Sequence, residues 1–309
     1  MYDIKYKIFF ILILIDYVQT HIRKLPFNTI VTFGDSNTDI GNVYNLTNSQ
    51  WPLVPPYHQG RFSNGPLWIE RLNIPNILNY AYGDATIDDD NFLPGFTGPN
   101  KIRVPGIRRQ IVAYLAIHDI STVDLSRTLY AIWANGNEYF INSSLSSDIV
   151  VESVLKTVYD LLVVGIKNLI IINLPPIHLY PGINKNKISE TLIIQHNYHL
   201  TSNLTQIQSN YKKVSIKIFD LYSLMINIIS NNSLNLLNTT DKCWNLVNHS
   251  IVSQCTNPDQ FVFIDDYHYT SVIHRVIADN IEQFIISLSN LRTSFSKFYI
   301  FMSIIIFLI

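Results

Sequence analysis

The amino-acid sequence predicts a single α/β domain built on a parallel β-sheet that is covered on both faces. Three observations support this fold class. Short apolar runs alternate with longer segments in which apolar residues recur at helical spacing. The apolar runs are continuous rather than alternating, which is typical of strands that are buried on both sides. No repeat, low-complexity linker or block of charge divides the chain of 309 residues.

The strands and helices are predicted in a regular order along the chain. In the segment Ile149–Ile166, for example, Ile149, Val150 and Val154 belong to one apolar stripe that is expected to face the core. Pro66 suits the first position of a further helix. The other elements, in chain order, are strand Thr29–Phe33, strand Ile77–Tyr82, helix Ile107–His118, strand Thr128–Ala134, helix Ile149–Ile166, strand Asn168–Asn173, helix Ser189–Tyr211, strand Val214–Phe219 and a last helix from Thr270 or Ser271 to about Ser287.

Composition and charge exclude several classes of protein. The chain has 22 Lys and Arg against 23 Asp and Glu, so no nucleic-acid partner is expected. Hydrophobic residues make up 48% of the chain, which excludes a disordered protein. Two cysteines are too few for a disulfide-rich scaffold or a Cys-rich zinc module.

The amino-terminal segment has the layout of a secretory signal peptide. Lys5 and Lys7 precede an apolar run at residues 8–15, which ends at Asp16. A positive segment followed by a short apolar run is typical of a signal peptide, and this run is too short to span a bilayer. We therefore expect residues 1–20 to be a signal peptide, with a buried strand or a short membrane anchor as the alternatives.

The carboxyl-terminal segment has the layout of a signal for GPI attachment. Residues 298–309 are apolar except for Ser303, and a polar spacer with Arg292 and Lys297 precedes them. The alternatives are a shallow membrane tail and a terminal helix packed on the core. We expect the domain over residues 26–288, the spacer and tail over residues 289–309, and a protein that is secreted or held at the cell surface.

If the protein is exported, its two cysteines and its N-glycosylation triplets become relevant. Cys243 and Cys255 can pair in an oxidising compartment; the alternative is two unrelated buried thiols. Asn-x-Ser/Thr triplets are acceptors for N-glycosylation, and their number is only slightly above what this composition produces by chance. Six asparagines begin such triplets: Asn45, Asn142, Asn203, Asn231, Asn238 and Asn248.

Polar residues follow four of the apolar runs directly. Three of these runs are followed by segments that carry Ser36, Gly83 and Asn137, and a run at residues 261–264 leads into Asp265 and His268. In open parallel sheets ligands bind at the carboxyl ends of the strands, because the loops there converge on one edge. We therefore expect these side chains to meet at one edge of the sheet.

These residue types suit acyl transfer. A serine hydroxyl such as that of Ser36 needs a base, here His268, and an acid, here Asp265, to fix the tautomer of that base. A tight strand-to-helix turn is expected to present Ser36 with its N–H at a positive helix end. The oxyanion is expected to bind the N–H groups of Ser36 and Gly83 and the side-chain amide of Asn137. Glycine at position 83 lets the backbone approach the substrate.

The combination resembles the GDSL esterase/lipases of the SGNH hydrolase family over nearly the whole body of the chain. The resemblance implies a flavodoxin-like, three-layer α/β/α fold and ester hydrolysis through an acyl-enzyme, without metal or organic cofactor. The expected substrate is a lipid or small-molecule ester, with an O-acetylated carbohydrate as the alternative. The segments similar to the family are Gly34-Asp35-Ser36 with Asp39, Gly60–Pro66, Asn79–Gly83, Asn137, Asn173–Pro176, Asp220–Leu224 and Asp265-x-x-His268.

Two positions depart from the family pattern. Glu138 stands where the family usually has Asp, and the longer side chain is expected to shift the loop that aims Asn137. Tyr269 stands where the family has Pro, beside the base. Neither change removes a catalytic group, but the rate and the substrate preference are left open.

The sequence also allows interpretations other than a hydrolase. A non-catalytic surface module that binds glycan on the same scaffold is the alternative of a different class. His196 and His199 lie one helical turn apart, but without a third ligand a half-buried helix face is favoured over a metal site. His178 follows a strand and is a candidate for the border of the cleft, and Phe62 for a wall of the pocket.

Overall fold

The computed structural model describes residues 25–134, 136–183 and 187–287. The expected signal peptide and carboxyl-terminal tail lie outside these residues. Phe27–Asn280 form one compact unit, which holds the sheet and the candidate site, and the described parts of a second unit are residues 25–26 and 281–287. None of the helices in the described part of the chain has the length and apolar character needed to cross a membrane.

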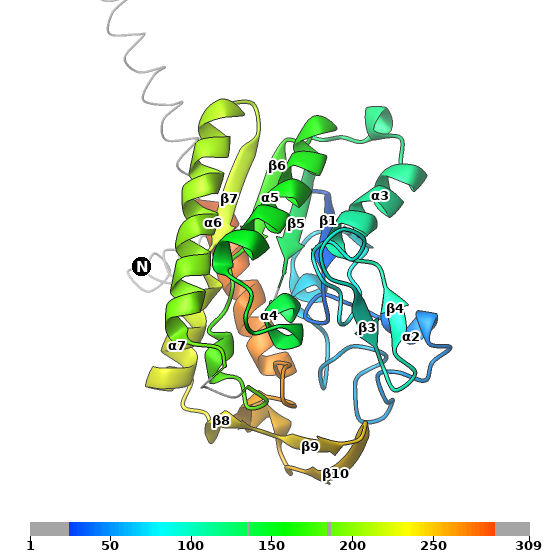
Figure 1. The fold of residues 1–309 in the computed structure, drawn as a ribbon, viewed down its shortest axis with the longest axis vertical. Helices are drawn as coiled ribbons and strands as arrows, with labels where there is room; N and C mark the ends of the chain where they lie inside the picture. Colours follow the sequence, from blue (N-terminus) through cyan, green and yellow to red (C-terminus); the bar gives the residue numbers. More distant parts are fainter. Residues whose placement is uncertain (1–24, 135, 184–186, 288–309) are drawn as a thin grey trace, which may run out of the picture. The chain divides into compact units, whose positions relative to one another are not determined.

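A parallel sheet of five strands forms the centre of the larger unit (Figure 1). The strands lie in the order β2-β1-β5-β6-β7, so the chain starts inside the sheet and builds outward to both edges. All six residues of β5 are buried, which agrees with a strand that has neighbours on both sides and helices on both faces. The strands are β1 (Thr29–Gly34), β2 (Asn76–Asn79), β5 (Thr128–Trp133), β6 (Asn168–Ile172) and β7 (Ser215–Phe219).

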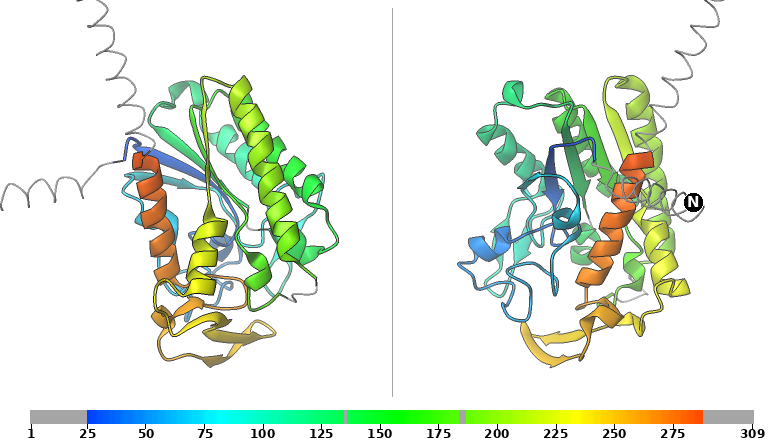
Figure 2. Two further views of the ribbon diagram at one scale, coloured as in Figure 1. Left: turned by 90° about the vertical axis from the view of Figure 1, so that its left-hand side faces the viewer. Right: turned by 180° about the vertical axis from the view of Figure 1, so that it is seen from behind.

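Helices cover both faces of this sheet, which confirms the predicted three-layer α/β/α fold (Figure 2). One face carries α3 (Ile107–Ile117), α5 (Ser147–Val163) and α6 (Glu190–Asn210), and α5 packs against both of the others. The other face carries α7 (Leu221–Asn231) and residues 271–280 of the last helix, which spans residues 271–287.

The predicted strands and long helices are found with bounds close to those expected, and three details differ. Ile149 is 49% exposed, whereas Val150 and Val154 of the same predicted stripe are buried, because Ile149 lies at the edge of the apolar face of α5. Strand β2 ends at Asn79, three residues before the predicted end. Pro66 is followed only by the short 3-10 helix η1 (Trp68–Arg71).

Short elements that the sequence pattern did not predict surround the ends of the strands. Cys243 and Cys255 form a disulfide across the base of the β9–β10 hairpin, where Cys255 N–H also donates to the carbonyl of Cys243 (2.8 Å). These elements are α2 (Asn42–Leu46), β3 (Gly95–Thr97), β4 (Ile102–Val104), η2 (Ile120–Thr122), α4 (Asn137–Ile141), η3 (Ile177–Leu179), β8 (Asn238–Lys242), β9 (Trp244–Val247), β10 (Ser250–Gln254), η4 (Pro258–Gln260) and β11 (Phe261–Phe263).

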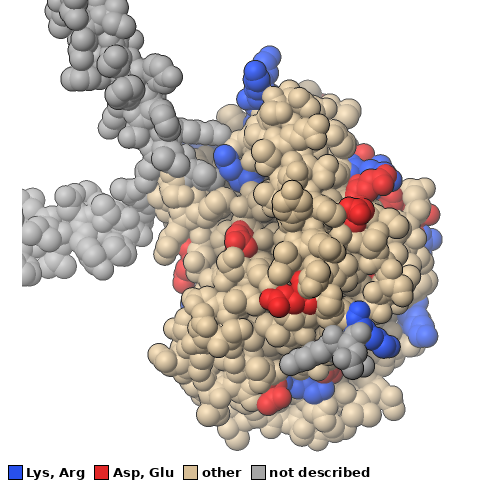
Figure 3. Space-filling view, turned by 60° about the vertical axis from the view of Figure 1, so that its left-hand side comes forward, with Lys and Arg blue, Asp and Glu red and all other residues tan. Residues whose placement is uncertain are grey.

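Charged side chains are sparse on the face of the molecule shown in Figure 3. On the face shown in Figure 3, the Lys and Arg side chains that the structure describes lie in small separate groups, with acidic side chains among them and uncharged surface between. This distribution agrees with the formal net charge of −1. It offers a nucleic-acid backbone no extended basic surface on that face.

Candidate active site

Ser36 lies in a tight turn directly after β1. The turn is closed by the amides of Thr38 and Asp39, which donate to the carbonyl of Asp35 (2.9 and 3.0 Å). Residues 36–38 are a turn, and the five-residue helix α2 begins only at residue 42. The expectation that Ser36 N–H sits at a helix end is therefore wrong.

The end of β1 is held rigidly beneath this turn. The side-chain amide of Gln110 on α3 accepts from Gly34 N–H (2.9 Å) and donates to Gly34 C=O (2.9 Å). A Cβ at Gly34 would lie 2.6 Å from the carbonyl oxygen of Trp133 on β5. Gly34 is thus required because neighbouring backbone passes too close for a side chain.

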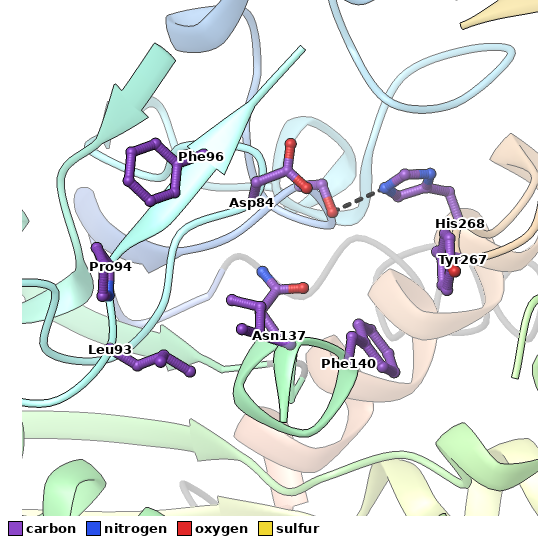
Figure 4. A pocket seen from close by; sticks show the side chains of 10 residues that line it. Asp84, Leu93, Pro94, Phe96, Asn137, Phe140, Tyr267 and His268 are labelled. Atoms are coloured by element: carbon purple, nitrogen blue, oxygen red, sulfur yellow. Dashed lines mark hydrogen bonds between the residues drawn. The ribbon is translucent and has the colours of Figure 1, made fainter. Parts of the chain in front are cut away.

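Asp265 and His268 come from the loop that follows β11, and the structure brings both to Ser36. His268 Nε2 lies 2.9 Å from Ser36 Oγ (dashed line in Figure 4). His268 Nδ1 lies 2.8 Å from each carboxylate oxygen of Asp265. A hydroxyl, an imidazole and a carboxylate therefore form one hydrogen-bonded chain, although Ser36 and His268 are 232 residues apart in sequence.

Burial and charge act in opposite directions on the two ionisable partners. Burial raises the pKa of the Asp265 carboxyl, but the charge of His268 and the hydrogen bonds that the carboxylate accepts outweigh burial, so this pKa lies below its usual value. Burial lowers the pKa of His268, but the negative charges of Asp265, Asp84 and Asp35 together raise it above 6.5. An ionised Asp265 thus stabilises a proton on the imidazole, as a general base requires.

Tyr57 is a further partner of Asp265 that the motif pattern did not assign. Its hydroxyl donates to Asp265 Oδ2 at 2.5 Å, across 208 residues of sequence. Asp265 Oδ1 accepts the backbone N–H groups of Tyr267 and His268 (both 2.9 Å). The sequence signal for Tyr57 is that it is an aromatic residue close to the catalytic segments, which suggests a place in the substrate groove or in the core; Tyr57 does not line the cavity.

Gly83 lies in the loop after β2, directly before Asp84, and its N–H has an acceptor within the protein. It donates to Asp39 Oδ2 at 2.8 Å, within a buried cluster of backbone amides. A Cβ at position 83 would lie 2.3 Å from Phe62 Cε2, so the group that excludes a side chain is Phe62. The prediction that Gly83 N–H binds the oxyanion is therefore wrong. The prediction that glycine is needed here for the approach of the substrate is also wrong, because the group that excludes a side chain is Phe62.

Asp39 organises this loop. Its carboxylate accepts from the amides of Gly41 and Asn42 through Oδ1 (2.8 and 2.6 Å) and from those of Val43 and Gly83 through Oδ2 (3.1 and 2.8 Å). Burial raises the pKa of Asp39 to about 6 in spite of these four bonds. The carboxylate therefore joins the start of α2 to the loop after β2.

Asn137 lies at the site as expected, at the first turn of α4. Its Nδ2 donates to the carbonyl of Ala85 (2.8 Å), and the side chain lines the pocket in Figure 4. The next residue, Glu138, is buried and accepts from Ile87 N–H through Oε1 (2.6 Å). Burial raises the pKa of Glu138 to about 7. Asn137 and Glu138 thus both bind the loop that follows Gly83.

A cavity of about 450 Å³ opens beside Ser36 and His268. Its polar lining includes the carboxylate of Asp84 and the amide of Asn137, and burial raises the pKa of Asp84. Figure 4 shows Phe96 and His268 on opposite sides of this space. The rest of its wall is largely apolar and consists of Leu93, Pro94, Phe96, Phe140, Ile141 and Tyr267.

The other sequence candidates take no part in this cavity. His196 is buried with Nδ1 2.8 Å from the hydroxyl of Tyr139, and His199 Nδ1 lies 2.6 Å from Asp148, so the two histidines have separate partners. Within the described ranges no group of three His, Cys, Asp or Glu side chains is placed to hold a metal. His178 and Phe62 do not line the cavity, but the Phe62 ring packs on the imidazole of His268 at 5.1 Å.

Comparison with known proteins gives the family. The model of the GDSL-like lipase/acylhydrolase family matches residues 30–281. The chain belongs to this family. This match confirms the resemblance inferred from the sequence motifs, which include the Gly-Asp-Ser segment with Ser36 and the later segment with His268.

Named relatives of this GDSL-like protein are distant. Phosphatidylcholine-sterol acyltransferase of Aeromonas hydrophila is 26% identical over 211 residues (66% of this chain, 61% of the relative), and the thermolabile hemolysin of Vibrio parahaemolyticus is 25% identical over 273 residues (82% and 62%). The chain thus spans about three fifths of these two relatives. A GDSL esterase/lipase of Arabidopsis thaliana is 24% identical over 323 residues (82% and 87%). The aryl esterase of M. smegmatis, a solved structure, has 16% identity and a TM-score of 0.47, covering 84% and 99%.

Proposed function

We propose that this GDSL-like protein hydrolyses carboxylic esters through an acyl-enzyme formed on Ser36. The observation that carries the proposal is the 2.9 Å contact between Ser36 Oγ and His268 Nε2, continued by Asp265 on the other ring nitrogen. A hydroxyl in contact with an oriented imidazole is the arrangement that activates serine as a nucleophile.

The reaction follows from this geometry in two balanced steps. Ser36 Oγ attacks the ester carbonyl while its proton passes to His268 Nε2, and Asp265 stabilises the imidazolium that forms. His268 then gives the proton to the departing alcohol, which leaves an ester between the acyl group and Ser36. Water attacks this acyl-enzyme by the same route, with His268 as base and then acid, and releases the carboxylic acid.

The negative oxygen formed in each step needs hydrogen-bond donors. Ser36 N–H, which has no acceptor among the residues that the structure describes, and the second Nδ2 hydrogen of Asn137 supply two. Gly83 N–H is left out of this set because Asp39 holds it. The expected hole is therefore formed by one backbone and one side-chain donor.

Labelling with a fluorophosphonate tests the proposal. The reagent is expected to label the folded wild-type protein and not Ser36→Ala, and ester hydrolysis by Ser36→Ala is expected to fall by several orders of magnitude. If the folded wild-type protein is neither labelled nor able to hydrolyse esters, the proposed enzymatic activity is wrong. A glycan-binding module on the same scaffold would then be the better interpretation.

The cavity favours acyl esters longer than acetate. Its volume of about 450 Å³ and its apolar wall exceed what an acetyl group can fill, whereas a longer acyl chain would bury apolar surface against Phe96 and Phe140. We therefore favour lipid or other long-chain esters over O-acetylated carbohydrates as the substrate class. In a series of p-nitrophenyl esters, kcat/KM should rise from acetate to medium-chain acyl groups; a steep preference for acetate contradicts this choice.

We also propose that the protein is exported, either secreted or held at the cell surface by its carboxyl-terminal segment. The disulfide between Cys243 and Cys255 supports this proposal, because disulfides persist mainly in oxidising compartments. Sequon asparagines such as Asn45, Asn142 and Asn248 lie exposed and are accessible to glycosylation. Expression in a secreting host tests whether the protein is exported, and mass analysis before and after removal of N-glycans tests whether these asparagines are glycosylated.

A further inference from the structure

We infer that Tyr57 is a positioning residue for the Asp265–His268 pair, acting through its hydroxyl on Asp265 Oδ2. The inference rests on the proposed ester hydrolysis and adds a fourth side chain to the hydrogen-bonded chain that starts at Ser36. No motif places Tyr57 there, because it precedes Asp265 by 208 residues.

The hydrogen bonds of Asp265 show why a fourth side chain is needed. The carboxylate is 3% exposed, so both oxygens need partners within the protein. Oδ1 accepts two backbone amides of its own loop as well as His268 Nδ1. Among the residues that the structure describes, Oδ2 accepts Tyr57 OH and the shared Nδ1 of His268. Without the Tyr57 hydroxyl, Oδ2 loses its hydrogen-bond partner from outside the loop, and the carboxylate is held only by groups of its own loop, Tyr267 N–H and His268.

The hydroxyl is well placed to remain a donor. Tyr57 is 3% exposed, and burial followed by the charge of Asp265 raises the pKa of its hydroxyl, which favours the protonated form that can donate. Donation to a carboxylate is charge-assisted and stronger than a bond between neutral groups. Tyr57 thus takes up part of the negative charge of Asp265 and lowers the share that acts on the imidazole of His268.

The Tyr57 ring is fixed by an aromatic cluster that also contacts His268. The cluster consists of Trp51, Tyr57, Phe62 and Trp244. Tyr57 packs edge-on against Trp244 with ring centroids 5.1 Å apart, and against Phe62 at 6.2 Å. Phe62 in turn lies 5.1 Å from the imidazole of His268. The same cluster therefore supports both partners, through a hydrogen bond at Asp265 and through ring packing at His268.

Tyr57→Phe separates the hydroxyl from the ring. The variant keeps the aromatic packing and removes one oxygen, so it is expected to unfold near the wild-type temperature. Because Asp265 then bears its full charge toward His268, the midpoint of the kcat/KM–pH profile should move to higher pH. We expect kcat to fall by about 10-fold with KM within about 2-fold of wild type, as for a lost hydrogen bond to a charged group.

Tyr114→Phe is the matched control, since its hydroxyl also forms a buried hydrogen bond (2.9 Å to Tyr130) but lies near the opposite ends of the strands. It should leave kcat and the pH profile unchanged. An unchanged pH profile and kcat in Tyr57→Phe would overturn the inference while wild-type hydrolysis still upheld the enzyme. Loss of hydrolysis in wild type itself would instead overturn the proposed function.

A double-mutant cycle distinguishes action through Asp265 from a general structural role. Tyr57→Phe is combined with Asp265→Asn, which removes the carboxylate charge on which the hydroxyl acts. If Tyr57 works through Asp265, its removal costs little further activity in the Asp265→Asn background. Equal losses in both backgrounds would show that Tyr57 only supports the core, and this outcome also decides the case if Tyr57→Phe is less stable than expected.

Discussion

Gly83→Ala adds one methyl group at the point where the loop after β2 passes the aromatic cluster. The new Cβ would lie 2.3 Å from Phe62 Cε2 and 2.5 Å from Cζ. Carbon atoms in contact are relaxed at about 3.5–4.0 Å, so the ring must retreat by more than about 1 Å. Phe62 is 3% exposed and has Trp51, Tyr57 and His268 around it, so it has no empty side to enter.

Overpacking of this kind costs about 1–3 kcal/mol, and we expect the free energy of unfolding of Gly83→Ala to fall by that amount. The activity should fall too, because the displaced ring is the one that packs on His268. Alanine keeps the backbone N–H and its bond to Asp39, so the loss comes from the methyl group. Urea unfolding and hydrolysis of a p-nitrophenyl ester measure the two effects.

Phe62→Leu supplies the control, because the smaller side chain gives the methyl group room. On its own this variant is expected to lose about 1–2 kcal/mol through the cavity it leaves. In its background Gly83→Ala should cost less than about 0.5 kcal/mol, so the two changes are not additive. The reasoning is refuted if Gly83→Ala matches wild type in stability, or if it costs as much with Phe62→Leu as without it.

Two further predictions concern stability. Burial raises the pKa of Glu138 from 4.5 to about 7, so the folded protein favours the protonated carboxyl. The resulting stabilisation is fully present below pH 4.5, and the free energy of unfolding falls by about 3 kcal/mol as the pH rises through 7. Glu138→Gln should therefore unfold with a flatter pH dependence than wild type across pH 4.5–7, and parallel curves would contradict this. Replacing Cys243 and Cys255 by serine opens a loop closed across 12 residues and should cost about 3 kcal/mol in thermal or urea unfolding; equal stability of the oxidised protein and this double variant would show that the bridge does not hold the hairpin.

The sheet and the long helices were predictable because their residues repeat a pattern. Strand β5 has no charged residue and is apolar after Thr128, as expected for a strand with neighbours on both sides. Helix α7 was missed although its sequence carries a signal: Asp220 caps it by accepting from Ser223 N–H (3.1 Å), and Leu221 and Met225 begin its buried face. The short strands outside the sheet have too few residues to show a period.

The hydrolytic residues were predictable because acyl transfer needs a hydroxyl, a base and an acid, and residues of these types follow predicted strands in the sequence. Ser36, Asp265 and His268 meet as expected. The direction of Gly83 N–H was not predictable, since Asp39 competes for it and the two loops meet only in the folded protein. Tyr57 is a similar case, because its partner is fixed by packing among rings rather than by spacing along the chain.

The separation of 232 positions between Ser36 and His268 has a consequence for biosynthesis. A ribosome delivers the hydroxyl early and the imidazole only when the domain is nearly finished, so a growing chain carries no competent nucleophile. Ester hydrolysis is therefore expected only after the two ends of the domain have come together in the folded chain.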